Sequence, residues 1–238
     1  MFSDKKLGLR QCDAARVVRV ARWRMFKDQL PFSYAPMDWA LGKDWNPDEL
    51  GNDQLGDCGP AAAVNWLNFM ADACGFEKRF TKDDALDLYR RLGYDGTPAT
   101  DNGVVLLDML REWYLNGVGG VKLDGFFAVG WMAEEHLSTA VSLCGPLIVG
   151  ATLTISCQST DTWTDEQGLD TREWGGHAFV YHAHSPGLGT SKTWGTAVYQ
   201  TAGFRGKRWN ECYLPICRAL LPPTGLDFDR LISLAEQF

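Results

Sequence analysis

The hydrophobic pattern of this 238-residue chain changes near residue 145. Before that point, apolar residues recur at steps of three and four, which is the spacing of one face of an α-helix. After it, short runs rich in β-branched residues follow one another, as is typical of β-strands. A chain whose helices precede its strands is expected to form an α+β fold with segregated halves.

Four helices and four strands are expected from these patterns. The helix candidates are residues 57–75, 81–92, 103–115 and 132–143. The first of them has Asp57 at a favourable N-cap position and Pro60 in the first turn, where proline is tolerated. The strand candidates are residues 146–155, 176–184, 197–201 and 213–221.

The first 50 residues form a separate kind of segment. They combine a basic helical stretch at residues 13–26 with an extended piece rich in Trp and Pro, and such a segment is expected to wrap around the body of the protein. The expected organisation is an N-terminal wrapping segment (1–50) and one domain (51–238). That domain has a helical half to about residue 145, a β-rich half at 146–221 and a C-terminal tail at 222–238.

Composition excludes several classes of partner. The 30 acidic and 23 basic side chains give a net charge of −7, which argues against binding nucleic acid or an anionic membrane through bulk electrostatics. The chain contains no run of about 18 apolar residues, so no membrane span is predicted. Charges are scattered through the first 20 residues, so no signal peptide is predicted. The seven cysteines are odd in number, and without a signal peptide we expect reduced thiols and a cytoplasmic location.

The stretch GNDQLGDCGPAAA places Cys58 in the first turn of an apolar helix, directly after a loop. The unpaired amides and the positive end of the helix dipole favour a thiolate, so we expect a depressed pKa for Cys58. The side-chain amide of Asn52 or Gln54 and the backbone amides of the loop are candidate donors to an oxyanion. A buried structural cysteine is the alternative interpretation.

A nucleophilic cysteine needs a base, and the chain has four histidines. His136 is expected on the surface of a helix. His177 begins an apolar strand, whereas His182 and His184 fall on the opposite strand face by simple alternation. His177 is therefore the predicted general acid–base, and a packed histidine at a strand edge is the alternative.

These segments resemble the motifs of the papain superfamily, especially the branch with the bacteriocin-processing peptidase domains. DCGPAA (57–62) resembles the nucleophile motif, and GHA (176–178) resembles the histidine strand. SKTWGT (191–196) resembles the Asn-Ser-Trp-Gly segment, which supplies the third triad residue and a shielding Trp. The interval from Cys58 to His177 is slightly shorter than in papain-type enzymes.

A closer resemblance is to an uncharacterised papain-like family of tailed phages and bacteria. The shared pieces are GNDxxGDC (51–58), GGHA (175–178), TWG (193–195) and a closing ExY (211–213). The resemblance implies a two-lobed papain-like fold, in which Cys58 heads the central helix and the β-rich lobe carries His177. It also implies that Trp194 shields the histidine.

Two positions depart from the papain pattern. Asn52 stands where those enzymes have the Gln of the oxyanion hole, with Gln54 as the other candidate donor. Lys192 aligns with the third triad residue, but a lysine cannot accept a hydrogen bond from the histidine. Thr193 or Gln200 could take its place, or Cys and His could act as a dyad.

The predicted function is hydrolysis of a peptide or amide bond by a Cys–His pair that uses no cofactor. The alternative is a structural or interaction protein with a decayed site, such as a virion component in a larger assembly, placed in the host cytoplasm or the virion. A zinc site built from Cys212, Cys217, His182 and His184 is a minor alternative, because the two cysteines are spaced too widely for the usual pattern. No Cys212–Cys217 disulfide is expected if both residues lie on one strand.

Overall fold

The computed structural model describes residues 1–17, 20, 22, 36–40, 48–165, 168–221 and 227–235. Its described helices are α1 (Ala14–Val17), α2 (Cys58–Cys74), α3 (Lys82–Arg91), α4 (Leu106–Asn116), α5 (Glu134–Cys144), α6 (Ala202–Arg208) and α7 (Phe228–Ala235). Its described strands are β1 (Leu9–Arg10), β2 (Met37–Asp38), β3 (Val104–Val105), β4 (Gly125–Ala128), β5 (Leu147–Thr154), β6 (Thr162–Trp163), β7 (Glu173–Ser185), β8 (Leu188–Thr193), β9 (Thr196–Thr201) and β10 (Trp209–Ile216).

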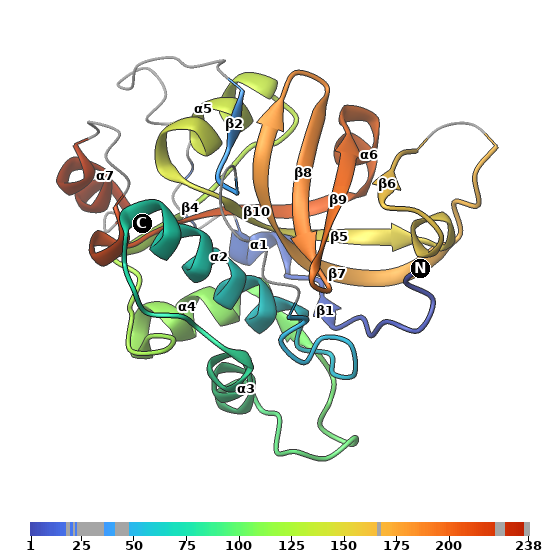
Figure 1. Cartoon of the computed structure of the whole chain (residues 1–238), viewed down its shortest axis with the longest axis horizontal. Helices are drawn as coiled ribbons and strands as arrows, with labels where there is room; N and C mark the ends of the chain where they lie inside the picture. The colour runs from blue at the N-terminus through green and yellow to red at the C-terminus, as the bar shows by residue number, and fades with distance from the viewer. Residues whose placement is uncertain are drawn as a thin grey trace.

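One eight-stranded sheet dominates the second half of the chain. Its strands follow the order β4-β10-β5-β7-β8-β9-β6, and β2 pairs with β7 beside this path. The neighbours are antiparallel except for the parallel pair β6 and β9. Strands β1 and β3 form a separate parallel pair. In Figure 1 the sheet occupies one side of the molecule, α3 and α4 occupy the other, and α2 lies between them.

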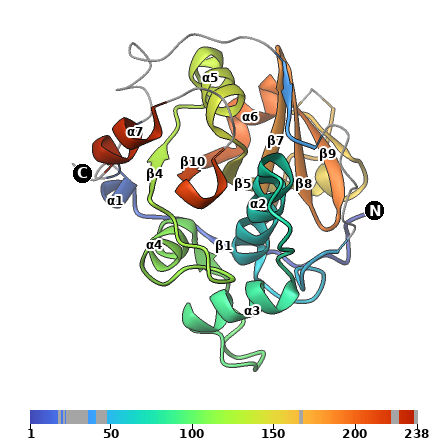
Figure 2. The same cartoon turned by 60° about the vertical axis from the view of Figure 1, so that its left-hand side comes forward.

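Helix α2 lies between the two halves because it is apolar on nearly every side. All of its residues from Cys58 to Ala71 are buried, as expected for a helix whose whole circumference is apolar. It packs on β7 on one side and on α3 and α4 on the other, an arrangement that Figure 2 shows from the side. The helix ends at Gly75, whose φ of 68° is a left-handed cap.

The other predicted helices lie close to their expected ranges. Helix α3 begins with a capping box between Thr81 and Asp84. Helix α4 begins at Leu106, later than expected, because the two preceding residues form strand β3. Of the predicted helix at residues 13–26, α1 covers four residues, and residues 18, 19, 21 and 23–26 lie outside the described part of the chain. None of the helices that the structure describes is long and apolar enough to cross a membrane.

The strands agree less well with the prediction than the helices do. Strand β10 starts four residues before the expected strand at 213–221, and a short 3₁₀ helix at Arg218–Leu220 replaces its expected end. Strand β8 has no counterpart among the predicted strands, because its sequence LGTSKT shows no apolar alternation. It nevertheless buries the polar side chains of Ser191, Lys192 and Thr193.

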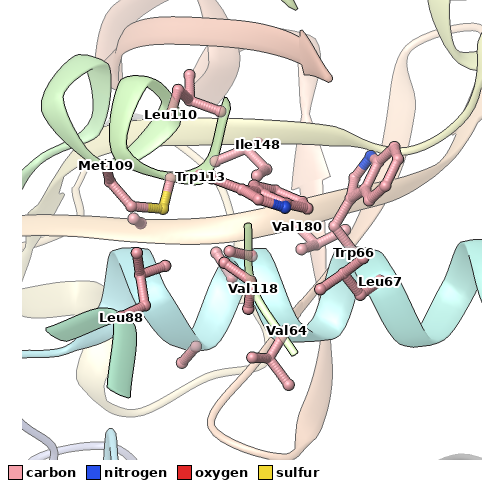
Figure 3. Packing of buried hydrophobic residues seen from close by; sticks show 14 of the residues in the cluster. Val64, Trp66, Leu67, Leu88, Met109, Leu110, Trp113, Val118, Ile148 and Val180 are labelled. Carbon is pink, nitrogen blue, oxygen red and sulfur yellow. The ribbon is translucent and has the colours of Figure 1, made fainter. Parts of the chain in front are cut away.

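Apolar side chains form two clusters, one on each face of the sheet. The first surrounds α2 and includes Trp66, Trp113 and Val180 (Figure 3). The second lies on the opposite face and includes Phe179 together with residues of α5. Because successive strand residues point to opposite faces, β7 contributes Val180 to one cluster and Phe179 to the other.

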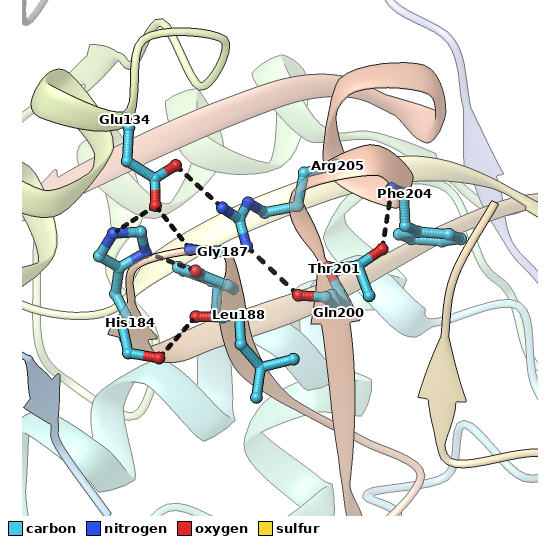
Figure 4. Close-up of polar contacts among 10 residues, drawn as sticks. Glu134, His184, Gly187, Leu188, Gln200, Thr201, Phe204 and Arg205 are labelled. Atoms are coloured by element: carbon cyan, nitrogen blue, oxygen red, sulfur yellow. Dashed lines mark hydrogen bonds and ion pairs between the residues drawn. The ribbon is translucent and has the colours of Figure 1, made fainter. Parts of the chain in front are cut away.

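A polar network, buried at Arg205 and His184, ties β7 to α5 and α6 (Figure 4). Arg205 of α6 is only 2% exposed, and its guanidinium donates to Glu134 Oε2 at 3.0 Å and to the Gln200 carbonyl at 3.2 Å. His184 Nε2 lies 3.2 Å from Glu134 Oε1, and its Nδ1 lies 2.7 Å from the Tyr181 hydroxyl. These contacts fix the end of β7 that lies beyond His177.

Candidate active site

Cys58 is the first residue of α2 and is 1% exposed. Backbone amides of Ala178, Gly8 and Gly59 lie close enough to its sulfur to favour the thiolate. Burial has the larger effect and raises the pKa of Cys58 to about 12. The prediction of a depressed pKa is therefore wrong for this structure, because lost hydration of the thiolate outweighs the helix terminus and the amide donors.

His177 lies on β7 and is fully buried. Its Nε2 atom lies 2.6 Å from Oγ1 of Thr193, the last residue of β8. The imidazole stacks on the indole of Trp194, with ring centres 4.0 Å apart and planes 14° apart. Thr193 and Trp194, which are adjacent in the chain, thus contact one edge and one face of the imidazole.

The other ring nitrogen of His177, Nδ1, forms no hydrogen bond among the described residues. Burial lowers the pKa of His177 to about 3, so the ring is neutral in this structure. The next residue of β7, Ala178, brings its amide to the Cys58 sulfur. The start of α2 and this part of β7 therefore meet at the candidate site, although no direct hydrogen bond joins the two side chains among the described residues.

A two-residue turn between β8 and β9 places Trp194 on the histidine. Trp194 and Gly195 have φ angles of 45° and 67°, the pattern of a type I′ hairpin turn. Glycine adopts such angles freely, but a bulky residue rarely does. Besides His177, the Trp194 ring contacts Phe2 at a centroid distance of 5.0 Å. These ring contacts offset the backbone strain and fix the indole.

Lys192 lies on the other face of β8. Its Nζ atom is 5.9 Å from the ring centre of Phe69 on α2, and burial lowers the pKa of Lys192 to about 8. Gln200, another candidate partner of the histidine, donates to Ser191 Oγ and accepts from the Trp209 indole. Of these candidates, the structure brings only Thr193 to His177 within its described part.

The two candidate oxyanion donors point elsewhere in this structure. The buried Asn52 amide donates to the Leu55 carbonyl at 3.0 Å and so closes the loop before Cys58. The exposed Gln54 amide donates to Asp53 at 2.9 Å. Next to the loop, burial raises the pKa of the Asp57 carboxyl to about 8, although the Asn52 side chain partly opposes this shift.

Residues 7–10, here called the cover segment, explain why the site is buried. The Gly8 amide lies at the Cys58 sulfur, and its carbonyl accepts from the Val104 amide at 2.7 Å. A Cβ atom on Gly8 would collide with the Gly56 carbonyl, so the chain fits here only as glycine. Sequence reasoning missed this contact, because a close approach of distant backbones leaves no periodic signal.

The remaining histidines and cysteines form no common site. A register shift in β7 after Tyr181 separates two histidines: His182 stacks on Phe69 of α2, whereas His184 belongs to the network with Glu134. All seven cysteines are free thiols. Within the described ranges, no three His, Cys, Asp or Glu side chains cluster as a metal ion would require.

Comparisons with known proteins agree on the fold. No protein-family profile matches the chain, and no curated protein matches it by sequence. Xylellain, a cysteine protease from Xylella fastidiosa, superposes with a TM-score of 0.71 at 13% identity, over 90% of this chain and 97% of that chain.

Two further solved structures are similar. The proCathepsin B S9 of Trypanosoma congolense has a TM-score of 0.63 at 9% identity, over 92% of this chain and 87% of its own. The digestive procathepsin L 3 of Tenebrio molitor larval midgut has a TM-score of 0.58 at 14% identity, over 80% and 72%. At such low identities the likeness concerns the fold, and the chain has the α+β fold of the papain-like cysteine proteases.

Proposed function

We propose that this protein is a cysteine hydrolase that cleaves a peptide or amide bond with Cys58 and His177. The observation that supports this most directly is the support of His177 by Thr193 and Trp194, next to the strand residue that contacts the Cys58 sulfur. Backbone strain is typical of functional sites, and here the strained turn holds the Trp194 indole against the buried His177 imidazole. This argument weighs against a decayed site in a structural protein.

Each residue has a distinct part in the proposed reaction. His177 takes the proton of the Cys58 thiol, the sulfur attacks the substrate carbonyl, and His177 then protonates the leaving amine. Water, activated by the same imidazole, hydrolyses the thioester. Thr193 is a positioning residue that engages Nε2 and leaves Nδ1 for the proton transfer. Backbone amides in the first turn of α2 are the candidate oxyanion donors, and Asn52 would have to exchange its bond to Leu55 to join them.

The described form is closed. Burial favours the neutral thiol and the neutral imidazole, so the pair is not ionised beneath the cover segment. Displacement of that segment lets water reach the sulfur and removes a main cause of the raised pKa of Cys58. Activity is therefore expected only after the cover segment moves.

The test uses the full chain and the substitution Gly8→Ala, whose added methyl group collides with the Gly56 carbonyl. The matched control is Gly203→Ala, where the nearest atom to an added Cβ is 3.9 Å away. Gly8→Ala should speed iodoacetamide labelling of Cys58 at pH 7 by about tenfold or more, since thiolate is the reacting form. Gly203→Ala should behave like the wild type.

Hydrolysis is then measured with a library of fluorogenic peptides. The Gly8→Ala protein should cleave some of them, and adding Cys58→Ser or His177→Ala should abolish cleavage. A Gly8→Ala protein that labels rapidly at Cys58 but leaves every peptide intact would contradict the proposed function.

Two further expectations stay predictions. One is that the protein belongs to the phage and bacterial family, and the other is that it is placed in the cytoplasm or in a virion.

A further inference from the structure

Asp101 is a carboxylate that joins three segments lying far apart in the chain, and its side chain is only 6% exposed. Its Oδ1 atom accepts hydrogen bonds from the Gly56 amide and from the Tyr89 hydroxyl, each at 2.8 Å. Its Oδ2 atom lies 3.3 Å from the Nζ atom of Lys6, the residue directly before the cover segment. Hydrogen bonds to a carboxylate are stronger than those between neutral groups, so these contacts fix the side chain.

The contact with Gly56 fixes one peptide group in the loop before Cys58. The N–H of Gly56 and the carbonyl of Leu55 belong to the same planar group and point in opposite directions. The N–H donates to Asp101, and the carbonyl accepts from the side-chain amide of Asn52 at 3.0 Å. Asp101 and Asn52 therefore hold opposite sides of one peptide group, and a rotation of that group would break both contacts.

Tyr89 of α3 keeps the Asp101 carboxyl in place. It is 1% exposed, and its hydroxyl accepts from the Gly103 amide at 3.0 Å while donating to Asp101. Burial and the bond to Asp101 raise the pKa of Tyr89, so the hydroxyl keeps the proton that it donates. The carboxyl thus connects a buried side chain of a helix to the loop before Cys58.

We propose that Asp101 is a positioning residue for Asn52, the candidate oxyanion donor, and acts through the peptide group that both residues contact. A donor is most effective when it is already in place as the charge develops. With Asp101 present, Asn52 has to exchange only its bond to Leu55, while the loop that carries it stays fixed. Without Asp101 the peptide group can rotate, and the loop has to be ordered during the reaction. The inference rests on the proposed function, because the oxyanion forms on the carbonyl that Cys58 attacks.

The first test measures peptide hydrolysis in the Gly8→Ala protein, in which the cover segment is displaced. Asp101→Ala should lower kcat by about tenfold or more and leave KM within about twofold, because the lost contact acts on the transition state. Asp101→Asn keeps an acceptor oxygen for Gly56 and Tyr89, so its kcat should stay within about threefold of the parent protein. Lys6→Gln removes only the contact to Oδ2 and is the matched control, with unchanged kcat.

An Asp101→Ala protein as active as its parent would overturn the inference. The same holds for an Asp101→Asn protein as impaired as Asp101→Ala, because the retained oxygen should rescue the contact. Far-ultraviolet circular dichroism verifies that each variant is folded. If Asp101→Ala does not fold, Asp101→Ser takes its place, because the serine hydroxyl is too short to reach both partners.

The second test asks whether Asp101 acts through Asn52. In the Gly8→Ala protein, Asn52→Ala should lower kcat by about a hundredfold, because the donor is lost. Adding Asp101→Ala to Asn52→Ala should lower kcat by less than about twofold further, because the residue that Asp101 positions is gone. The inference fails if the two substitutions multiply in effect, or if Asn52→Ala is fully active.

A third measurement needs no catalysis. Deuterium exchange of the Gly56 amide is followed by nuclear magnetic resonance in the otherwise wild-type protein. It should be at least about tenfold faster in Asp101→Ala and within about threefold of wild type in Asp101→Asn. Unchanged exchange in Asp101→Ala would contradict the inference. If exchange behaves as expected but the Gly8→Ala protein cleaves no peptide, the proposed function fails, and Asp101 supports the loop without a part in any reaction.

Discussion

The Oγ1 atom of Thr193 lies 2.6 Å from the Nε2 atom of His177, and this bond sets the orientation of the imidazole. Both residues are buried, on neighbouring strands β8 and β7. A threonine hydroxyl can accept the proton of Nε2 but carries no charge, so it orients the ring without raising its basicity as a carboxylate does. The contribution of Thr193 should therefore lie in positioning.

The first prediction concerns this hydrogen bond. In the Gly8→Ala background, Thr193→Val should lower kcat by about tenfold or more, because the isosteric side chain keeps the packing but cannot hold the ring. Thr193→Ser keeps the hydroxyl and should retain most of the activity. The measurement is peptide hydrolysis across pH 5–9. Equal activities for the valine and serine variants would show that the bond has no part in positioning.

The second prediction concerns the turn. Trp194→Ala and Trp194→Gly remove the same indole, but only glycine relieves the φ of 45°. Both should destabilise the protein by about 3–5 kcal/mol through lost packing. The glycine variant should be the more stable of the two by roughly 0.4–1 kcal/mol, as measured by urea unfolding. The opposite order would mean that the turn relaxes once the ring is gone.

The third prediction is a loss of stability in acid. Because burial lowers the pKa of His177 to about 3, the unfolded chain binds its proton more readily than the folded chain does. This contribution to stability is complete above about pH 6.5 and is lost as the pH falls toward 3, at up to about 1.4 kcal/mol per unit. His177→Gln should flatten the fall in urea midpoint between pH 6.5 and 4. An unchanged slope would assign the acid sensitivity to other groups, such as His182, whose pKa burial also lowers.

The fourth prediction concerns Asp57, whose pKa burial raises to about 8. Folding then favours the protonated carboxyl, so its contribution is present below about pH 4 and is lost as the pH rises toward 8. Asp57→Asn cannot ionise and should stabilise the protein at pH 8 relative to wild type, by more than at pH 5. Thermal unfolding at both pH values measures the difference. A variant destabilised equally at both would show that the carboxyl has a structural partner that an amide cannot replace.

Sequence patterns predict the elements whose signals are local. Helix α2 is predicted because an apolar run follows Asp57 and ends before Gly75, and strand β7 because β-branched and aromatic residues follow Gly176. Cys58 is found in the same way, from its place at the start of α2, and His177 from its place in the apolar strand β7.

The support of His177 is harder to predict. The motif resemblance aligns Lys192 with the third triad position, but the hairpin turn at Trp194 directs Thr193 to the ring and Lys192 to the opposite face. The positive φ angles at that turn decide which of these two residues faces the His177 ring, and a tryptophan in the sequence does not predict such angles. The low exposure of Cys58 depends on Gly8, about 50 residues earlier, which local patterns cannot reveal.

Strand β1 lies in the cover segment and pairs in parallel with β3, so the segment that covers the site belongs to the same chain. A free peptide that enters the cleft must therefore compete with a tethered segment, whose effective concentration is on the order of millimolar. Short peptides at micromolar concentration would rarely displace it. A large molecule that binds the residues before Leu7, and draws the strand away, would expose the thiol at far lower concentration.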